Sequence, residues 1–361
     1  MPFYLGQKGL QHSKSLRRPI FTLAIGLLPL SISIIQAQKV TLPASLAAPN
    51  TSIIAVKTGL QYSEGPAIDS SGNLFFSEFL KPNHRIWKVA PGQEPQVWLA
   101  ASQESNGLEF DPQNRLVACS KGRVLRYNSS AQVTDTLAPP PGSPTIGGEV
   151  NDLSFGPKGD FYFTNFVGGS VFYVSTSGNM TEFKLGDNPN GVEWIPEKGL
   201  VLVNQNGKNR VLAFSDGGGG KLENQKVFTQ VAGPDGLTLD EQGNVYVASW
   251  SLKTVFVYDS TGKELGKIEV NAANVSNCVF GGPQGKTLFI TGDGGCRKVE
   301  LLVAGRKQYP KPVSIKNFRA HKAARSQQFT LSKQQAPRQN QRDVLGQKVG
   351  KGEKTLTLQP K

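Results

Sequence analysis

Residues 234–249, "PDGLTLDEQGNVYVAS", predict a β-hairpin whose first strand opens on an acidic residue. Leu237 and Leu239 alternate with polar residues, a polar turn follows at 241–244, and a second alternating run begins at Val245. Asp235 stands immediately before the glycine at the start of this unit. A single polar residue there would be an ordinary turn residue, so its meaning depends on whether the pattern recurs.

The same pattern occurs six times along the chain, each time with a polar opening residue. The spacings between successive openers are 42, 45, 39, 45 and 42 residues. A period of this length with several short strands per repeat is typical of propeller blades. The openers are Glu64, Asn106, Asn151, Asn190, Asp235 and Asn277. The sequence therefore predicts an all-β fold, a six-bladed β-propeller at residues 50–305 with four-stranded antiparallel blades around a central channel. A strand at 52–57 is expected to close the ring beside residues 298–304.

The charge lies at the ends of the chain. The protein has 361 residues and a net charge of +13, but residues 306–361 hold 14 Lys and Arg against two acids. The segment between the ends is mildly acidic, so nucleic-acid binding by the folded domain is not expected. The composition of 306–361 predicts a disordered basic tail, either a tether to an anionic surface or a dispensable extension.

The N-terminus predicts export. Four basic residues precede an apolar run at 20–35, and small residues follow to Ala37. Residues 1–37 are therefore predicted to be a signal peptide of a periplasmic or secreted protein, with membrane anchoring as the alternative if cleavage does not occur. Cys119 and Cys278 are expected to be buried apolar residues, and pairing of Cys278 with Cys296 is left open.

The openers predict a cation site. If they occupy equivalent places on the inner strands, their side chains converge on the axis of the ring. Two carboxylates and four amides, with no His or Cys, provide oxygen ligands that suit a hard cation such as Ca²⁺. Without a cation, Glu64 and Asp235 would repel each other in a narrow channel. A polar, water-filled channel is the alternative.

Several of these segments resemble one known family. The stretches "SEGPAIDSSGNLFFSE", "NDLSFGPKGDFYFTN", "NPNGVEW" and "GPDGLTLD" are similar to the signature turns of the senescence marker protein, gluconolactonase and luciferin-regenerating enzyme family. The resemblance covers about residues 60–303. It implies a six-bladed propeller with one divalent cation, for which Ca²⁺ is expected and Zn²⁺ or Mn²⁺ are alternatives. The implied metal ligands are Glu64, Asn151, Asn190 and Asp235, and Asn106 and Asn277 would line the pocket.

The resemblance also implies a reaction. Members of the family hydrolyse lactones, small-molecule esters whose carbonyl a bound cation can polarise. Asp235 would be the catalytic general base or nucleophile as well as a ligand. Diisopropylfluorophosphatase-like relatives use the same four positions on phosphotriesters, so the metal centre alone does not define the substrate. A non-catalytic binding propeller is the second alternative.

One position departs from the pattern of the family. Sugar-lactone members often carry Arg two residues before the third opener, where this chain has Glu149. A carboxylate there accepts hydrogen bonds from substrate hydroxyls and repels anionic substrates, so Glu149, Asn106 and Asn277 are the predicted substrate-binding residues. The Pro- and Gly-rich stretch 138–148 is predicted to be either a loop that shapes the pocket mouth or an irregular connection. Trp250 is expected to pack between blades, with stacking on a ligand as the alternative.

Overall fold

The structure, a computed structural model, describes residues 38–80 and 82–307. The predicted signal sequence and residues 308–361 of the predicted tail lie outside the described residues. Within the described ranges, no helix is long and apolar enough to cross a membrane.

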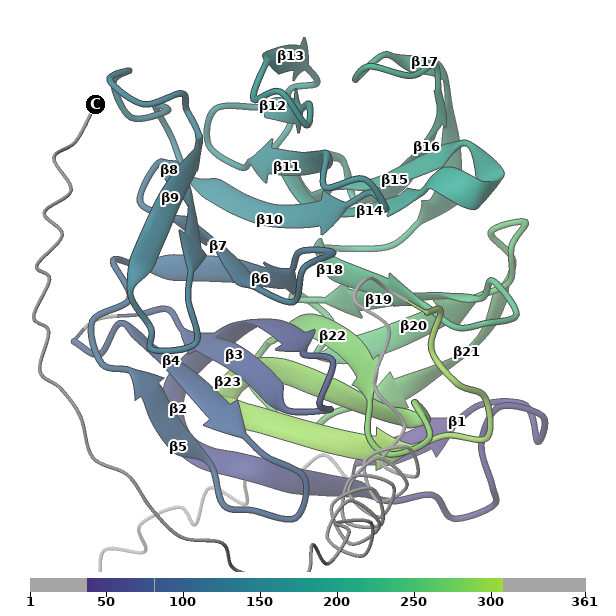
Figure 1. Cartoon of the computed structure of the whole chain (residues 1–361). Coiled ribbons are helices and arrows are strands. Elements are labelled where there is room, and N and C mark those ends of the chain that lie inside the picture. Colours follow the sequence, from purple (N-terminus) through teal and green to yellow (C-terminus); the bar gives the residue numbers. More distant parts are fainter. Residues whose placement is uncertain (1–37, 81, 308–361) are drawn as a thin grey trace, which may run out of the picture. The chain divides into compact units, whose positions relative to one another are not determined.

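The described residues form a β-propeller of antiparallel sheets, most of them four-stranded (Figure 1). Three sheets follow chain order. They consist of β6 (Ser105–Phe110), β7 (Leu116–Ser120), β8 (Arg123–Tyr127) and β9 (Val133–Ala138); β10 (Val150–Phe155), β11 (Phe161–Asn165), β12 (Ser170–Val174) and β13 (Met180–Lys184); and β14 (Pro189–Ile195), β15 (Leu200–Gln205), β16 (Arg210–Asp216) and β17 (Leu222–Gln230). Two 3₁₀ turns, η1 (Pro196–Lys198) and η2 (Asn206–Lys208), flank β15.

The fourth sheet gains a strand from the N-terminal side of the chain. It contains β18 (Pro234–Leu239), β19 (Val245–Ser249), β20 (Thr254–Tyr258) and β21 (Glu264–Glu269), and β1 (Lys39–Thr41) pairs with the edge of β21. Leu46, just after β1, is 2% exposed and packs in the same apolar cluster as Tyr246 and Ile268. The segment before residue 50 is therefore part of the fold, which the sequence did not predict.

The sequence predicts six blades, whereas the strands pair into five sheets. The difference lies in one six-stranded sheet, formed by β22 (Val275–Gly281), β23 (Thr287–Glu300), β2 (Ile53–Ile68), β3 (Leu74–Glu78), β4 (Arg85–Val89) and β5 (Gln96–Leu99). Residues 53–62 of β2 pair with β23, and residues 63–68 pair with β3. Because Ile53 lies opposite Val299, the predicted closure of the ring by the N-terminal strand is confirmed.

An irregularity at the opener is common to the inner strands. In β6, β10, β14 and β18 the pairing shifts by one residue, and the opener is the first of the two residues within the bulge. The second bulge residue is glycine in three of these strands: Gly107 and Gly191 lie against the backbone of the next inner strand, and Gly236 lies against the side chain of Asn277. A Cβ on Gly191 would lie 2.4 Å from the carbonyl oxygen of Asp235, and one on Gly107 would lie 2.5 Å from that of Asn151. Close approaches of this kind explain why glycine follows the opener in four of the six repeats.

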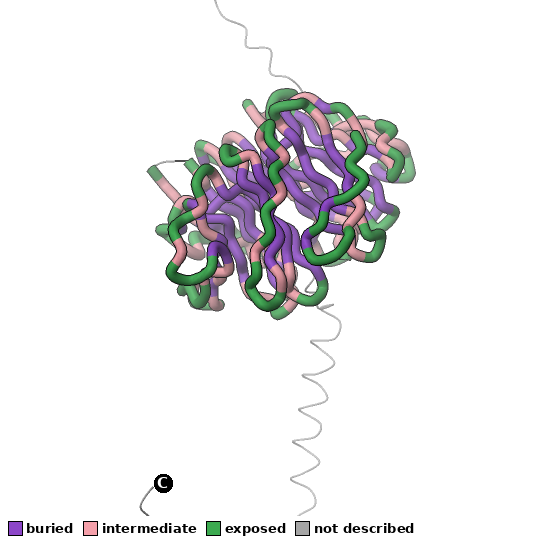
Figure 2. Tube along the Cα trace, turned by 90° about the horizontal axis from the view of Figure 1, so that it is seen from above, coloured by how far each residue is buried: buried purple, intermediate pink, exposed green. Residues whose placement is uncertain are grey.

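Apolar side chains of adjacent sheets fill the space between them. Tyr162 and Tyr173 of one sheet, for example, pack edge-on against Trp194 of the next. Figure 2 shows buried residues along the strands and exposed residues at the peripheral turns. The three cysteines are buried and free, so Cys278 and Cys296 are not bridged. The prediction that Cys119 and Cys278 are buried apolar residues is confirmed.

The chain beyond the last strand is tied to the propeller. Gly305 forms a β-bridge with Asp240, and the backbone N–H of Arg306 donates to the carbonyl of Leu239 at 2.9 Å. The guanidinium of Arg306 pairs with Glu193 and donates to the carbonyl of Trp194 at 3.0 Å. Arg306, which the sequence assigned to the tail, therefore belongs to the fold.

Candidate active site

Six of the seven predicted site residues line one cavity of about 250 Å³ at one end of the inner strands. Five other residues complete its wall, and most of them are aromatic: Tyr62, Phe79, Phe166, Asn206 and Trp250. The six predicted residues are Glu64, Asn106, Glu149, Asn151, Asn190 and Asp235. Four of the openers among them lie in the bulges of β6, β10, β14 and β18, whereas Glu64 pairs with Ser77 just before the bulge of β2.

Asp235 and Glu64 provide the carboxylates of the cavity, and both are at least 95% buried. The side chain of Asn190 hydrogen-bonds to Asp235, and the Asn204 amide donates to the backbone carbonyl of Asp235 at 2.6 Å. Glu64 accepts from the N–H of Gly65 at 2.9 Å and from the hydroxyl of Tyr62 at 3.4 Å. Both carboxylates therefore have fixed positions within the pocket.

Burial and mutual repulsion disfavour the ionised forms of the carboxylates in the cavity. Burial raises the pKa of Glu64 to about 8, with further contributions from Asp152 and Glu149. Burial, and then the charge of Glu64, raise the pKa of Asp235 well above its usual range. In the described residues, neither carboxylate forms an ion pair with Lys or Arg. Two buried carboxylates without a protein cation favour a proton or a metal ion between them.

The chemistry of the donors fits a hard cation better than a soft one. The described residues contain no group of three or more His, Cys, Asp or Glu side chains arranged to hold a metal. The candidate set instead combines two carboxylates with the amides of Asn151 and Asn190, and oxygen-only sets of this kind suit Ca²⁺. The residues implied as ligands by the sequence therefore fit the ion, with two charges to match a divalent cation.

Glu149 lies beside two of the openers, Asn106 and Asn151, which hold its carboxylate. Its carboxylate accepts from the amide of Asn106 at 3.4 Å and from the side chain of Asn151. Its backbone N–H donates to Asn165 Oδ1 at 2.9 Å. Burial raises the pKa of Glu149 above its usual value. The structure thus places an acceptor, where family members often have Arg, within the same cavity as the openers.

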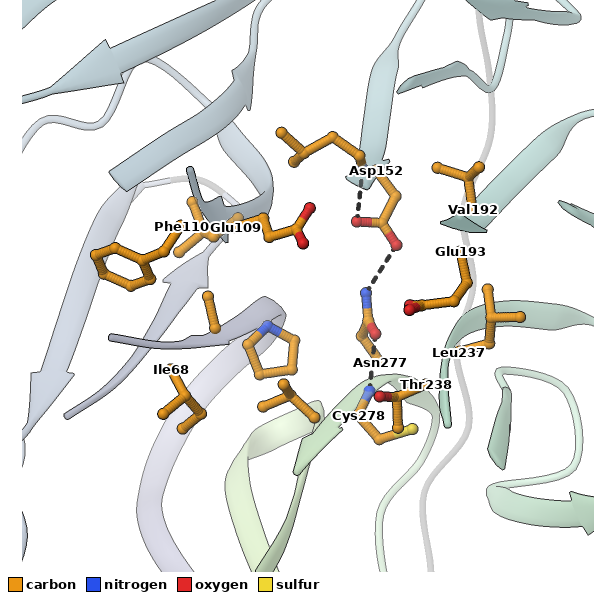
Figure 3. A pocket seen from close by; sticks show the side chains of 15 residues that line it. Ile68, Glu109, Phe110, Asp152, Val192, Glu193, Leu237, Thr238, Asn277 and Cys278 are labelled. Atoms are coloured by element: carbon orange, nitrogen blue, oxygen red, sulfur yellow. Dashed lines mark hydrogen bonds between the residues drawn. The ribbon is translucent and has the colours of Figure 1, made fainter. Parts of the chain in front are cut away.

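Asn277 is the exception among the predicted site residues. It is the second residue of the bulge in β22, after Ser276, so its side chain leaves the strand on the other side. It lines a different cavity of about 30 Å³, where its amide donates to Asp152 at 3.2 Å and its carbonyl accepts from the N–H of Cys278 (Figure 3). Asn277 therefore does not line the cavity that the other six predicted residues share.

This second cavity contains acidic residues that the sequence did not single out. Glu109, Asp152 and Glu193 point toward it together with Asn277 (Figure 3). Burial raises the pKa of Asp152 to about 7. Glu109 and Glu193 each stand three residues after an opener, Asn106 and Asn190. With the bulges at these openers known, this spacing would have predicted that both side chains point into the channel. The aromatic wall of the first cavity was also missed, except for Trp250, which is 44% exposed there rather than packed between blades.

Comparison with known proteins identifies the family. The sequence profile described as "SMP-30/Gluconolactonase/LRE-like region" matches residues 62–293, and the chain belongs to this family. The chain is 26% identical over 320 residues to the gluconolactonase of Zymomonas mobilis, covering 71% of this chain and 83% of the relative. It is 28% identical over 195 residues to pentonolactonase XacC of Haloferax volcanii, covering 50% of this chain and 64% of the relative.

Solved structures are similar over most of the described residues. XC5397 of Xanthomonas campestris, described as a gluconolactonase, superimposes with a TM-score of 0.66 and 25% identity over 73% of this chain and 94% of that protein. Regucalcin of Agrobacterium tumefaciens, described as a calcium-binding protein, superimposes with a TM-score of 0.58 and 18% identity over 72% of this chain and 97% of that protein. The second likeness, at this identity, concerns the fold alone.

Proposed function

We propose that the protein is an exported, divalent-cation-dependent lactonase. The observation that carries the proposal is the meeting of Glu64, Asn151, Asn190 and Asp235 in one cavity whose lining, among the described residues, contains no Lys or Arg. Membership of the family and similarity to two proteins named as lactonases support hydrolysis of a lactone. We further propose that the six-stranded sheet contains two blades, divided within β2 at residues 62 and 63, which makes the propeller six-bladed.

The four residues Glu64, Asn151, Asn190 and Asp235 would hold the cation, and Ca²⁺ is the ion we propose. When bound, the cation would neutralise the two carboxylates and polarise the lactone carbonyl. Zn²⁺ and Mn²⁺ are the alternatives to be tested. Regucalcin of Agrobacterium tumefaciens, which has a similar fold and is described as a calcium-binding protein, agrees with this choice.

Asp235 would act as the general base. In hydrolysis, the oxygen of a water molecule bonds to the lactone carbonyl carbon, the ring C–O bond breaks, and the product is a hydroxy acid. Asp235 would take the proton from the attacking water and return it to the ring oxygen that leaves. Asn190 and Asn204 orient this residue through its carboxyl group and its backbone carbonyl. Asn106 and Glu149, which line the same cavity, would bind groups of the substrate.

The test uses the purified chain, stripped of metal with a chelator and reloaded with Ca²⁺, Zn²⁺ or Mn²⁺. Lactone and phosphotriester hydrolysis would be followed by acid release, and bound metal would be counted by elemental analysis. We expect one ion per chain and metal-restored lactone turnover. Asp235→Asn should lower turnover by at least about 100-fold, while Asp135→Asn, at a half-exposed carboxylate outside the cavity, serves as the matched control.

The outcomes separate the alternatives. Turnover of phosphotriesters without lactones would replace the proposed substrate class. Stoichiometric metal without turnover of either ester would refute an enzymatic role and favour a binding propeller. Export is tested separately, by cell fractionation and by sequencing the N-terminus of the mature protein, and retention of residues 1–37 on a cytoplasmic protein would refute it.

A further inference from the structure

The candidate active site shares part of its wall with a larger groove. Phe79 and Glu149 line both the active-site cavity and a third cavity of about 530 Å³. We call this third cavity the outer groove, and its other lining residues are Glu104, Lys121, Gly122, Thr145, Ile146, Gly147, Gly148, Val150 and Val167. Clefts that hold drug-sized ligands have volumes of about 300–1,000 Å³. A ligand that extends past Phe79 and Glu149 into both cavities is therefore larger than one that the active-site cavity alone accommodates.

The inner end of this joint space contains two hydrogen-bond acceptors. Asn106 is 2% exposed, and its Oδ1 has no hydrogen-bond partner. Its Nδ2 donates to Glu149, which turns Oδ1 away from that carboxylate and leaves it for a ligand. A buried carbonyl without a partner is costly. A ligand bound here is expected to donate, through a hydroxyl or an amide N–H, to Asn106 and Glu149.

The outer end is mostly apolar and electrically balanced. Phe79, Ile146 and Val167 contribute apolar side chains, and Val167 is 64% exposed. Lys121 forms an ion pair with Glu104 at 3.5 Å, so these two charges offset each other. Apart from Glu149, where the groove meets the active-site cavity, the charged residues of its lining are paired with each other. Covering Val167 and Ile146 with an apolar substituent removes apolar surface from water.

The wall between the two cavities is fixed by one buried amide. Asn165, 2% exposed, accepts through Oδ1 from the N–H groups of Glu149 and Gly168, both at 2.9 Å, and donates to the carbonyl of Gly147 at 2.6 Å. The N–H of Ile146 also donates to the carbonyl of Gly122 at 2.9 Å. The loop that ends the stretch 138–148 is thus pinned at both sides of the groove, as expected for a wall that shapes a binding site.

We propose that the substrate of this protein is a lactone with a hydrogen-bond donor beside the ring and an apolar substituent of several carbons. The donor lies against Asn106 and Glu149, and the substituent lies in the outer groove against Phe79, Ile146 and Val167. This inference rests on the proposed lactonase function, which it narrows from lactones in general to hydroxylated or amide-bearing lactones with an apolar chain.

The test compares lactones that share one ring. δ-Valerolactone has neither feature, glucono-δ-lactone has only the hydroxyls, δ-decalactone has only the alkyl chain, and hydroxylated δ-decalactone has both. With the metal-loaded full chain we expect kcat/KM to be highest for hydroxylated δ-decalactone, by roughly tenfold over either partial analogue. Equal or higher kcat/KM for glucono-δ-lactone would overturn the inference while leaving the lactonase proposal intact.

Variants locate the effect. Val167→Asp and Ile146→Ser should each lower the ratio of kcat/KM between δ-decalactone and δ-valerolactone about fivefold or more. Glu149→Gln should lower the ratio between the hydroxylated and plain δ-decalactones. Val133→Asp is the matched control, because Val133 is also exposed but lies on the outermost strand β9. Ratios that do not change in Val167→Asp and Ile146→Ser would overturn the placement of the chain in the groove.

A binding experiment separates failure of the inference from failure of the proposed function. The lactam analogue of hydroxylated δ-decalactone resists hydrolysis and is titrated into the metal-loaded protein by calorimetry. Binding that weakens in Val167→Asp and not in Val133→Asp supports the ligand class even if no lactone is hydrolysed. Absence of binding by the lactam, together with absence of selectivity among lactones, overturns it.

Discussion

A close approach between two inner strands supports a quantitative prediction for Gly191→Ala. A Cβ at this position would lie 2.4 Å from the carbonyl oxygen of Asp235, 2.8 Å from Leu237 Cδ2 and 2.9 Å from the Cα of Gly236. Two of these atoms belong to the backbone of β18, so relief requires β14 and β18 to separate. Gly191 does not have a left-handed φ, so the cost comes from the contact rather than from backbone conformation.

The expected magnitude follows from the cost of overpacking. Inserting a methyl group into a close-packed interior typically costs about 1–3 kcal/mol. Because the neighbours are mainly backbone atoms, we expect a cost for Gly191→Ala at the upper end of this range, about 3 kcal/mol. For a domain of this size the melting temperature should fall by roughly 6–12 °C. The separation of β14 from β18 also moves Asn190 away from Asp235, so calcium affinity should fall as well.

Urea unfolding followed by tryptophan fluorescence measures this loss of stability. An m-value equal to that of the parent protein shows that the two transitions can be compared directly. Gly147→Ala is the matched control, because a Cβ there meets no heavy atom within 4 Å and the φ angle is not left-handed. The control should stay within about 0.5 kcal/mol of the parent protein. If Gly191→Ala is equally neutral, the inner strands are not held by this contact and our explanation of the repeated glycine is wrong.

Three further predictions concern the rest of the fold. Burial and the charge of Glu193 raise the pKa of Glu109, so the folded protein binds a proton at Glu109 more tightly than the unfolded chain does. Glu109 therefore lowers the stability of the protein as the pH rises above the ordinary carboxyl pKa, and the unfolding free energy of Glu109→Gln, relative to the parent, should increase from about pH 5 to about pH 8. A difference that shrinks over this range would contradict the prediction. Arg306→Ala removes the cation beside Glu193 and the bond to the Trp194 carbonyl and should cost about 3 kcal/mol in chemical denaturation, with a smaller loss in Arg306→Lys. Leu46→Ala should cost about 2–4 kcal/mol by the same measurement, and an effect under about 0.5 kcal/mol would show that the N-terminal segment does not contribute to the core.

The repeat predicted the architecture because each unit carries its own local signals. Alternating apolar residues, a polar turn and a fixed period indicate strands and their order without any long-range information. The predicted contact of residues 52–57 with 298–304 also followed, since a closed ring needs a last partner. The attachment of β1 to β21 and the position of Arg306 could not be predicted, because both depend on edges that exist only after the sheets have formed.

The sequence predicted the location of most candidate site residues, but not that of Asn277. Aligning the hairpins puts Asn277 in the same column as Asn106, yet the two side chains enter different cavities. The bulge of β22 begins one residue before its opener, at Ser276, whereas the bulge of β6 begins at its opener, Asn106. A shift of one residue in a strand reverses the face to which a side chain points. No pattern of residue types reveals this shift, because Asn is compatible with both bulge positions.

The bulge of β10 contributes one residue to each of the two cavities that contain acidic side chains. The first bulge residue, as in Asn151, points to the candidate active site, and the second, Asp152, points to the cavity that Asn277 and Glu109 also line. Asp152 contributes to the raised pKa of both Glu64 and Asp235, so its charge is felt across the ring of openers. Consecutive residues of one strand thus supply a candidate ligand and a buried carboxyl behind it. Carboxyl groups on both sides of the inner strands therefore act together on Glu64 and Asp235. This favours a divalent cation over a neutral ligand beside these two residues and leaves recognition of the organic substrate to Asn106 and Glu149.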